Sequence, residues 1–176
     1  MSQLPTNESL DPGEEVGTAD ERAILETFLD LYRGIVKRKL RGLSEEDATR
    51  RLVPSMTTLA GIVKHLRWVE MNWFQRVLAG RPAEDLPPVP WSDDDPDADF
   101  RMEPGETVEQ LIASYDEACA GSRAEAAIRS LDDTGLHRRT GTVSLRWIYV
   151  HMIEEYARHN GHADLIREAI DGVTGD

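Results

Sequence analysis

The sequence predicts an all-α protein, a four-helix bundle, from three observations. Apolar residues recur at helical spacing in four segments, strand-like alternation is missing over any useful length, and stretches rich in Pro and Gly separate the segments. With 176 residues, 40% hydrophobic and 30% charged, the chain can form one core and cover it with charge. We therefore expect a single helical domain over residues 20–172, preceded by a mobile N-terminal arm over residues 1–19.

The arm is rich in Pro, Gly, Ser and acidic residues and has few apolar side chains to offset the entropy of ordering. Asp20 is suited to cap the first helix, because its carboxylate can accept a hydrogen bond from a free backbone N–H. Apolar residues then follow one helical face to about Leu40. Gly42 and Pro54 break that pattern and indicate an irregular link to the second helix.

The second helix is expected to begin between Ser55 and Thr58 and to end at Gly80. Its apolar face consists of Leu59, Ile62, Val63, Leu66, Val69, Trp73 and Val77. The segment that follows, residues 80–106, is rich in proline and cannot form regular helix. It is therefore expected to be a long loop between helices 2 and 3, and loops of this length are often functional.

The third helix is expected to begin with a capping box formed by Thr107 and Gln110 and to run to about Leu131. A polar link over residues 132–141 comes next. The fourth helix is expected to begin after Thr142 and to end at Asp171, before the stop signal of a glycine.

Charge and composition exclude several classes of partner. The chain has 20 Lys and Arg against 33 Asp and Glu, a formal net charge of -13, which repels the phosphate backbone of nucleic acids and anionic membranes. No apolar run approaches the roughly 18 residues of a membrane span, and the first residues lack the pattern of a signal peptide. The single cysteine, Cys119, cannot form an internal disulfide and is expected to be a small packed residue without chemistry. These features predict a cytoplasmic protein.

Candidate metal ligands concentrate in the fourth helix. At 100° per residue, His151, Glu155, His159 and His162 fall within about 80° of one another, beside the apolar stripe of that helix. Glu155 and His159 are one turn apart, so both can reach one ion, and His65 is the imidazole that the second helix offers. The alternative is that these residues form a solvated edge, with histidines that only pack beside the core.

Three segments resemble the DinB-like superfamily, specifically a subgroup long catalogued as a domain of unknown function. They are TLAGIVKHLRWVEMNWF from Thr58, DPDADFRMEPGETVEQLIASYDEACAGSR from Asp95, and SLRWIYVHMIEEYARHNGHADLIREAIDG from Ser144. The resemblance covers roughly residues 20–172, and it is specific because separate segments match in order. It implies a four-helix bundle of DinB-like type that is generally a homodimer.

The resemblance also implies a ligand set. In DinB-like proteins a histidine of the second helix and two residues one turn apart on the fourth hold a metal, and these positions match His65, Glu155 and His159. Many relatives have a histidine at the position of Glu155, whereas the mycothiol-dependent isomerase branch has glutamate. His162, often glutamine in relatives, is the catalytic candidate and the first reserve ligand; His151 is the second.

The family includes transferases that use mycothiol, bacillithiol or glutathione, so the resemblance implies a small-molecule substrate and mycothiol as a thiol cosubstrate. Zn²⁺ is the metal expected first, with Ni or Fe as alternatives. A Zn²⁺ ion with an open position can favour the thiolate form of a thiol, which attacks electrophiles. Two function classes stay open: a metal-dependent thiol transferase, and a noncatalytic metal-binding or small-molecule-binding bundle connected with stress. Candidate acid–base groups are His162, His151 and Tyr156.

Two further patterns concern the long loop. Asp95, Asp97, Asp99 and Glu106 occupy positions one, three, five and twelve of a calcium loop, but Phe100 replaces the glycine that the turn requires. A solvated acidic loop is the expected reading. The four tryptophans are expected to anchor the core or an interface, with Trp91 in the loop as the exception that could contact a substrate.

Overall fold

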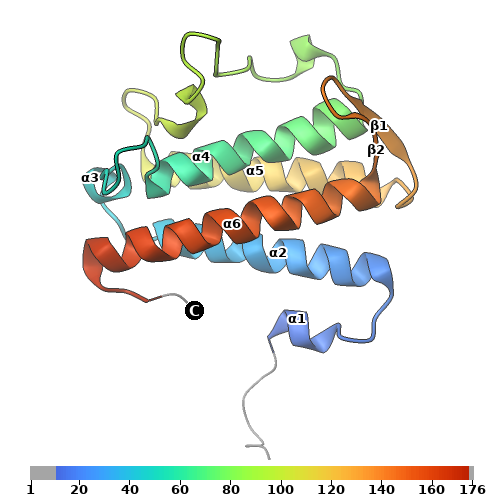
Figure 1. Cartoon of the computed structure of the whole chain (residues 1–176), viewed down its shortest axis with the longest axis horizontal. Helices are drawn as coiled ribbons and strands as arrows, with labels where there is room; N and C mark the ends of the chain where they lie inside the picture. Colours follow the sequence, from blue (N-terminus) through green and yellow to red (C-terminus); the bar gives the residue numbers. More distant parts are fainter. Residues whose placement is uncertain (1–10, 175–176) are drawn as a thin grey trace, which may run out of the picture.

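The computed structural model describes residues 11–174, which are mostly helical (Figure 1). Within this range six α-helices accompany one antiparallel pair of strands. The α-helices are α1 (Pro12–Glu15), α2 (Glu21–Leu40), α3 (Glu45–Ala48), α4 (Leu59–Glu70), α5 (Val108–Ala127) and α6 (Leu145–Asp171). The other elements are the π-helix η1 (Met71–Leu78), the 3₁₀ turns η2 (Ala83–Asp85) and η3 (Ala98–Phe100), and the strands β1 (Thr134–His137) and β2 (Gly141–Ser144).

The long helical segments are α2, α4 continued by η1, α5 and α6, and they lie alongside one another (Figure 1). Helix α6 packs against both α2 and α4, and α4 also packs against α5. The main core lies between these helices, and its largest fully buried apolar side chains include Leu29, Phe74, Leu111, Leu145 and Met152. Polar residues at the edge of the core stripe of α6 therefore face the seam with α4.

The helices begin where local sequence signals place them. The side chain of Asp20 accepts a hydrogen bond from the backbone of α2, and that of Thr58 does the same for α4. Thr107 and Gln110 form the expected capping box at the start of α5. Helix α6 ends at Gly172, which has a φ of 76° in the left-handed region. The predictions for Asp20, for Thr107 with Gln110 and for Gly172 are confirmed, and α4 begins directly after the predicted range of residues 55–58.

The second long helix is not uniform. It was expected to be one helix to Gly80, but α4 widens into the π-helix η1 after Glu70. The adjacent rings of Trp73 and Phe74 are both buried in this stretch, Trp73 toward β1 and α6 and Phe74 toward Tyr149. π-Helical turns are rare and often occur at functional sites.

The expectation of a polar link over residues 132–141 and of no strands is wrong. Strands β1 and β2 form an antiparallel hairpin in which Thr134 pairs with Ser144 and His137 pairs with Gly141. β1 crosses η1 so closely that a Cβ on Gly135 would lie 2.1 Å from the carbonyl oxygen of Val77. Four residues per strand are too few for alternation to be recognised in the sequence, and only a glycine permits the close approach.

Helix α5 ends at Ala127, earlier than the expected end near Leu131. The Arg22 side chain of α2 donates hydrogen bonds to the carbonyl oxygens of Ala126 and Arg129, at 2.9 and 2.6 Å. These bonds satisfy carbonyl groups that a continuing helix would have satisfied itself, so the helix can stop there.

Residues 1–10 of the expected N-terminal arm lie outside the described residues. In the rest of the arm, Pro12–Glu15 forms the short helix α1, which Asp11 caps and which contacts α2. Between residues 11 and 174, every helix is too short or too polar to cross a lipid bilayer. The long segment between η1 and α5 carries the turns η2 and η3, and η3 packs against α4 (Figure 1).

Candidate metal centre

Three candidate ligands from two helices converge at the seam between α4 and α6. His65 lies on α4, and Glu155 and His159 lie one turn apart on α6. One donor atom from each of the three lies within 4.8 Å of the other two. We call this group the metal triad. Helical spacing brings Glu155 and His159 together, and the packing of α4 on α6 adds His65.

The metal triad is largely withdrawn from solvent. His159 is 8% exposed, whereas Glu155 and His65 are half-buried. The rings of His65 and His159 lie 4.9 Å apart, and His159 Nε2 lies 3.5 Å from Glu155 Oε2. His159 Nδ1 is buried and has no hydrogen-bond partner among the described residues. An unsatisfied polar atom inside a protein is costly, so this nitrogen calls for a further partner, such as a water molecule or an ion.

His65 is held from behind by a residue of the long loop. Its Nδ1 donates a hydrogen bond of 2.7 Å to Asp99 Oδ2, and its ring stacks on Phe100 with centroids 4.5 Å apart. The other ring nitrogen, Nε2, is thus left as the acceptor. Histidine ligands of metals commonly donate their second N–H to a carboxylate in this way, which fixes the ring orientation and the tautomer.

Asp99 is the residue of the site that sequence reasoning missed. It was read as part of a solvated acidic loop, but it is 4% exposed and bonded to His65, so that reading is wrong for this residue. The loop approaches α4 at Gly61, where an added Cβ would lie 2.4 Å from the carbonyl oxygen of Phe100. Gly61 stands one turn before His65 on α4, so this glycine and the apolar Phe100 beside Asp99 were the signals that could have located it.

Two of the other three carboxylates of the calcium-like pattern have separate partners. Asp95 pairs with Arg101, and Glu106 Oε2 lies 2.8 Å from Lys64 Nζ. With Asp99 on His65, these groups do not point at a common centre. The structure therefore gives the pattern a role in holding the loop, not in binding calcium.

The electrostatics of the metal triad favour an ionised carboxylate. His159 and then Arg158, whose Nη2 lies 2.6 Å from Glu155 Oε2, lower the pKa of Glu155 to about 2. The donor set is therefore one carboxylate and two imidazoles. Such a set, with positions left for exogenous ligands, suits Zn²⁺ and also first-row metals such as Ni and Fe.

The two reserve ligands lie at different places. His151 is half-buried between Trp73 and Trp147, and with Glu154 and Glu155 it forms a second group whose donor atoms lie within 4.8 Å of one another. The two groups are adjacent, because Glu155 belongs to both. His162 is exposed, with its ring 5.7 Å from that of His159, and belongs to neither group.

Two other residues considered for chemistry belong to the core. Tyr156 is fully buried, and its hydroxyl donates to Glu70 Oε1 at 2.7 Å, so the suggestion that it serves the metal site is wrong. Cys119 is buried as expected, and burial followed by the charge of Glu70 raises the pKa of its thiol to about 12.

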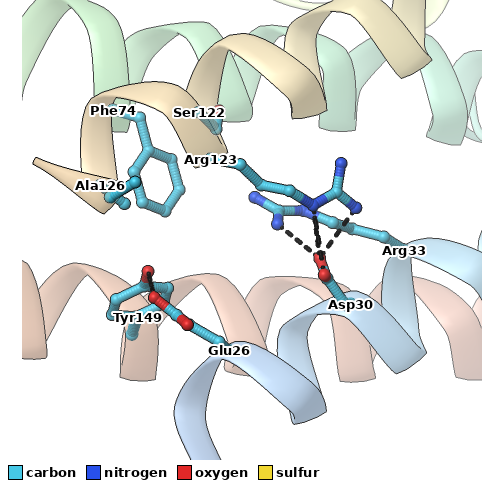
Figure 2. A pocket seen from close by; sticks show the side chains of 9 residues that line it. Glu26, Asp30, Arg33, Phe74, Ser122, Arg123, Ala126 and Tyr149 are labelled. Atoms are coloured by element: carbon cyan, nitrogen blue, oxygen red, sulfur yellow. Dashed lines mark hydrogen bonds and ion pairs between the residues drawn. The ribbon is translucent and has the colours of Figure 1, made fainter. Parts of the chain in front are cut away.

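A cavity of about 160 Å³ lies between α2, α5 and the start of α6, away from the metal triad (Figure 2). Its charged groups neutralise one another. Asp30 pairs with Arg33 at 2.8 Å and with Arg123 at 2.9 Å, and the hydroxyl of Tyr149 donates to Glu26 at 2.9 Å. With its polar groups already paired, this cavity has the character of a structural gap and not of a reactive site.

A comparison with models of protein families places the chain in a family. The sequence model of the family Mycothiol-S-transferase matches residues 24–172. The chain belongs to this family. No curated protein matches it at a significant level.

The matched range contains the metal triad, Asp99, α4, η1, α5, α6 and all but the first three residues of α2. Membership in the Mycothiol-S-transferase family indicates a mycothiol-related enzyme and is consistent with the DinB-like resemblance of the sequence. The finer assignment, to the subgroup of unknown function, stays a prediction.

Proposed function

We propose that this member of the Mycothiol-S-transferase family is a divalent-metal-dependent transferase of a low-molecular-weight thiol, with mycothiol as the cosubstrate. The observation that carries the proposal is the convergence of His65, Glu155 and His159 within 4.8 Å, with a buried unpaired nitrogen on His159 and Asp99 behind His65. Three metal-binding side chains that meet at one point, with one of them oriented by a carboxylate from behind, are the usual arrangement of a metal site.

In the proposal His65, Glu155 and His159 hold the ion, with Zn²⁺ as the first candidate and Ni or Fe as alternatives. When bound, such an ion lowers the pKa of a thiol, so that the sulfur reacts as a thiolate. The thiol loses its proton and its sulfur bonds to an electrophilic carbon. In a substitution the leaving group departs with the electron pair of the broken bond; in an addition to a double bond the π pair moves to the neighbouring atom, which takes up a proton. Asp99 orients His65 through its Nδ1–H.

His162 is the proposed acid–base residue. It is exposed and lies beside His159, so it can exchange a proton with solvent at the edge of the centre. His162→Gln is expected to lower kcat and to leave the metal content unchanged. A loss of metal in this variant would make His162 a ligand instead.

The finer description of the fold belongs to the same proposal. The long helices are proposed to form a DinB-like four-helix bundle, and the chain is proposed to act as a cytoplasmic homodimer. The exposed apolar side chains of Trp147, Val150 and Leu165, which share one side of α6, support the dimer.

Elemental analysis of the purified protein tests the ligand set. The wild type is expected to carry one divalent ion per chain, and His65→Ala and His159→Ala are expected to lose it. His137→Ala is the matched control, because His137 lies on the hairpin outside both groups of candidate ligands. Equal metal content in all four proteins would refute the ligand set.

The activity is tested with the metal-loaded protein, mycothiol, bacillithiol and glutathione in turn, and a panel of electrophiles. Loss of free thiol and formation of the thioether adduct are measured by mass spectrometry. Turnover that His65→Ala abolishes supports the transferase. Full metal loading without turnover on any thiol would favour a noncatalytic binding protein.

A further inference from the structure

A second, larger pocket is lined by residues of η1 and of the hairpin. The hairpin lies beside η1 (Figure 1), at the other end of the α4–η1 helix from the start of α4. The pocket has a volume of about 630 Å³. Three separate parts of the chain form it: η1, the long loop, and the hairpin with its turn. The polar and aromatic lining consists of Asn72, Arg76, Trp91, His137, Arg138 and Arg139.

The pocket is positively charged in an acidic protein. Although the chain carries a net charge of -13, no carboxylate lines the pocket in the described part of the chain. Arg76, Arg138 and Arg139 form no ion pair with residues 11–174, in contrast to arginines such as Arg33 and Arg123, which are paired with Asp30. Three uncompensated guanidinium groups at one pocket attract an anion.

Neighbouring groups respond to this charge. Burial, followed by the positive charge of Arg139, lowers the pKa of His137, and His151 and Arg138 contribute in the same direction. The imidazole of His137 is thus held in its neutral form more firmly than in solvent. The arginines, and not the histidine, therefore supply the charge of the pocket.

Arg76 packs against an aromatic ring. It is half-buried on η1, its guanidinium carbon lies 5.9 Å from the centre of the Trp68 ring, and its Nε is buried without an acceptor among the described residues. A planar guanidinium group matches the two oxygens of a carboxylate or phosphate, and such charge-assisted pairs are among the strongest hydrogen bonds in proteins.

The remaining wall is apolar and aromatic. Trp91 is 40% exposed, and its ring is held at its edge by Trp68, with centroids 5.6 Å apart. Val89 and Leu136 are also exposed at this pocket. An anion with an apolar or aromatic body fits such a mixture better than an inorganic ion does.

We propose that this pocket, the arginine pocket, binds the carboxylate or phosphate of a small organic substrate whose apolar body lies against Trp91. A chain of contacts joins this pocket to the metal triad. The ring of Trp73 contacts the rings of His137 and His151, with centroids 4.7 and 4.6 Å apart. His151 Nε2 in turn lies 3.9 Å from Glu155 Oε1. The word substrate rests on the proposed function, and the ligand would be the electrophile of the transfer.

Direct binding tests the pocket without turnover. Naphthoate, naphthyl phosphate, neutral naphthylmethanol and inorganic phosphate are titrated into the full-length protein by calorimetry at low ionic strength. The two organic anions are expected to bind about tenfold or more tightly than the neutral alcohol, because charge-assisted hydrogen bonds to arginine are strong. Naphthoate and naphthyl phosphate report which oxyanion is preferred. Equal affinity for anion and alcohol, or no saturable binding, would overturn the proposal.

Variants locate the binding. Arg139→Ala and Arg138→Ala are each expected to weaken naphthoate binding by about tenfold. Arg41→Ala is the charge-matched control, because Arg41 is an exposed arginine at the C-terminal end of α2 and does not line the pocket, and it should keep wild-type affinity. Trp91→Ala is expected to weaken the binding of naphthoate but to leave the affinity for inorganic phosphate unchanged. Equal losses in Arg41→Ala and Arg139→Ala would show a general charge effect and refute the site.

The His65→Ala protein separates this inference from the metal chemistry. Naphthoate binding that survives in this variant belongs to the arginine pocket; binding that is lost with the metal belongs to the triad and overturns the inference. If thiol transfer is active, Arg139→Ala is expected to raise KM for carboxylate electrophiles by about tenfold at unchanged kcat. If transfer fails while anion binding maps to the pocket, the proposed function falls and the pocket stands.

Discussion

Two groups of polar side chains lie between the same long helices, and they differ in how completely they are satisfied. The first, which we call the core network, consists of Arg33, Glu70, Tyr115, Ser122 and Tyr156. Glu70, with no exposed surface, accepts two hydrogen bonds from Arg33, at 2.8 and 2.7 Å, and one from Tyr156 at 2.7 Å. Every charge in this network has its counterpart.

The metal triad lies on two of the helices that carry the core network, α4 and α6, but its polar atoms are not all paired. Glu70 and His65 both belong to α4, and Tyr156 directly follows Glu155 on α6. Yet Tyr156 turns to the core network, whereas Glu155 turns to His159, which retains a buried nitrogen without a partner.

The difference is between a cluster whose polar groups are all paired and one that retains an unpaired nitrogen. In the core network, burial favours a lower pKa for Arg33, but the charge of Glu70 outweighs it and holds that pKa well above its ordinary value. The network is closed and ties α2, α4, α5 and α6 together. In the metal triad the donors point at one another without pairing fully, which is costly unless a further group completes them.

The largest expected effect is on the core network. Glu70→Ala leaves Arg33 buried without its main counterion, and breaking a buried pair in this way costs about 3–5 kcal/mol of unfolding free energy. Urea unfolding followed by circular dichroism measures it. Glu117→Ala, an exposed residue of α5, is the control and should change stability by less than about 0.5 kcal/mol. Similar small changes in both variants would show that the network is not structural.

The metal triad should respond to its ion instead. A ligand present at 100 times its Kd stabilises the folded protein by about 2.7 kcal/mol, which corresponds to a rise in Tm of about 5–10 °C for a chain of this size. Adding Zn²⁺ to metal-free wild type should give this rise, and His159→Ala should not. An equal rise in the variant would place the ion elsewhere.

Sequence reasoning identified the parts of this comparison that depend on local spacing. The caps at Asp20 and Thr107 involve residues within one turn, so they could be read directly. Glu155 and His159 share a helical edge for the same reason. His65 was added because it is the imidazole that the second helix offers and because the family resemblance implied it, since nothing local relates α4 to α6.

What could not be predicted depends on the path of the chain in space. Asp99 reaches His65 across 34 positions of sequence, and only the close approach of the loop at Gly61 permits it. The hairpin depends in the same way on Gly135 beside Val77. Tyr156 looked like a site residue because it is adjacent to Glu155, but neighbouring residues on a helix point about 100° apart.

Asp99 gives a smaller effect on the metal triad. Asp99→Asn keeps the size of the side chain but weakens the acceptor for His65 Nδ1–H, and such changes behind a ligand usually lower metal affinity by about 10–100-fold. Competition with a coloured chelator measures the affinity. Asp97→Asn, two residues away and exposed, is the matched control. Unchanged affinity in Asp99→Asn would mean that the hydrogen bond does not support the ligand.

The smallest expected effect concerns Cys119, which borders the core network with its sulfur 4.0 Å from the hydroxyl of Tyr156. The folded-state pKa of about 12 exceeds the ordinary 9.0, so the stability that the protonated thiol contributes is complete below pH 9 and declines as the pH rises from there toward about 12.

Thiol labelling measures how well this region is closed. At pH 8 Ellman's reagent should label the native protein only as fast as the protein opens, and should label the urea-unfolded protein at once. Cys119→Ser supplies the baseline. Glu70→Ala should accelerate labelling because it loosens the same network, whereas His159→Ala should not; rapid labelling of the native wild type would show that the network is open to solvent.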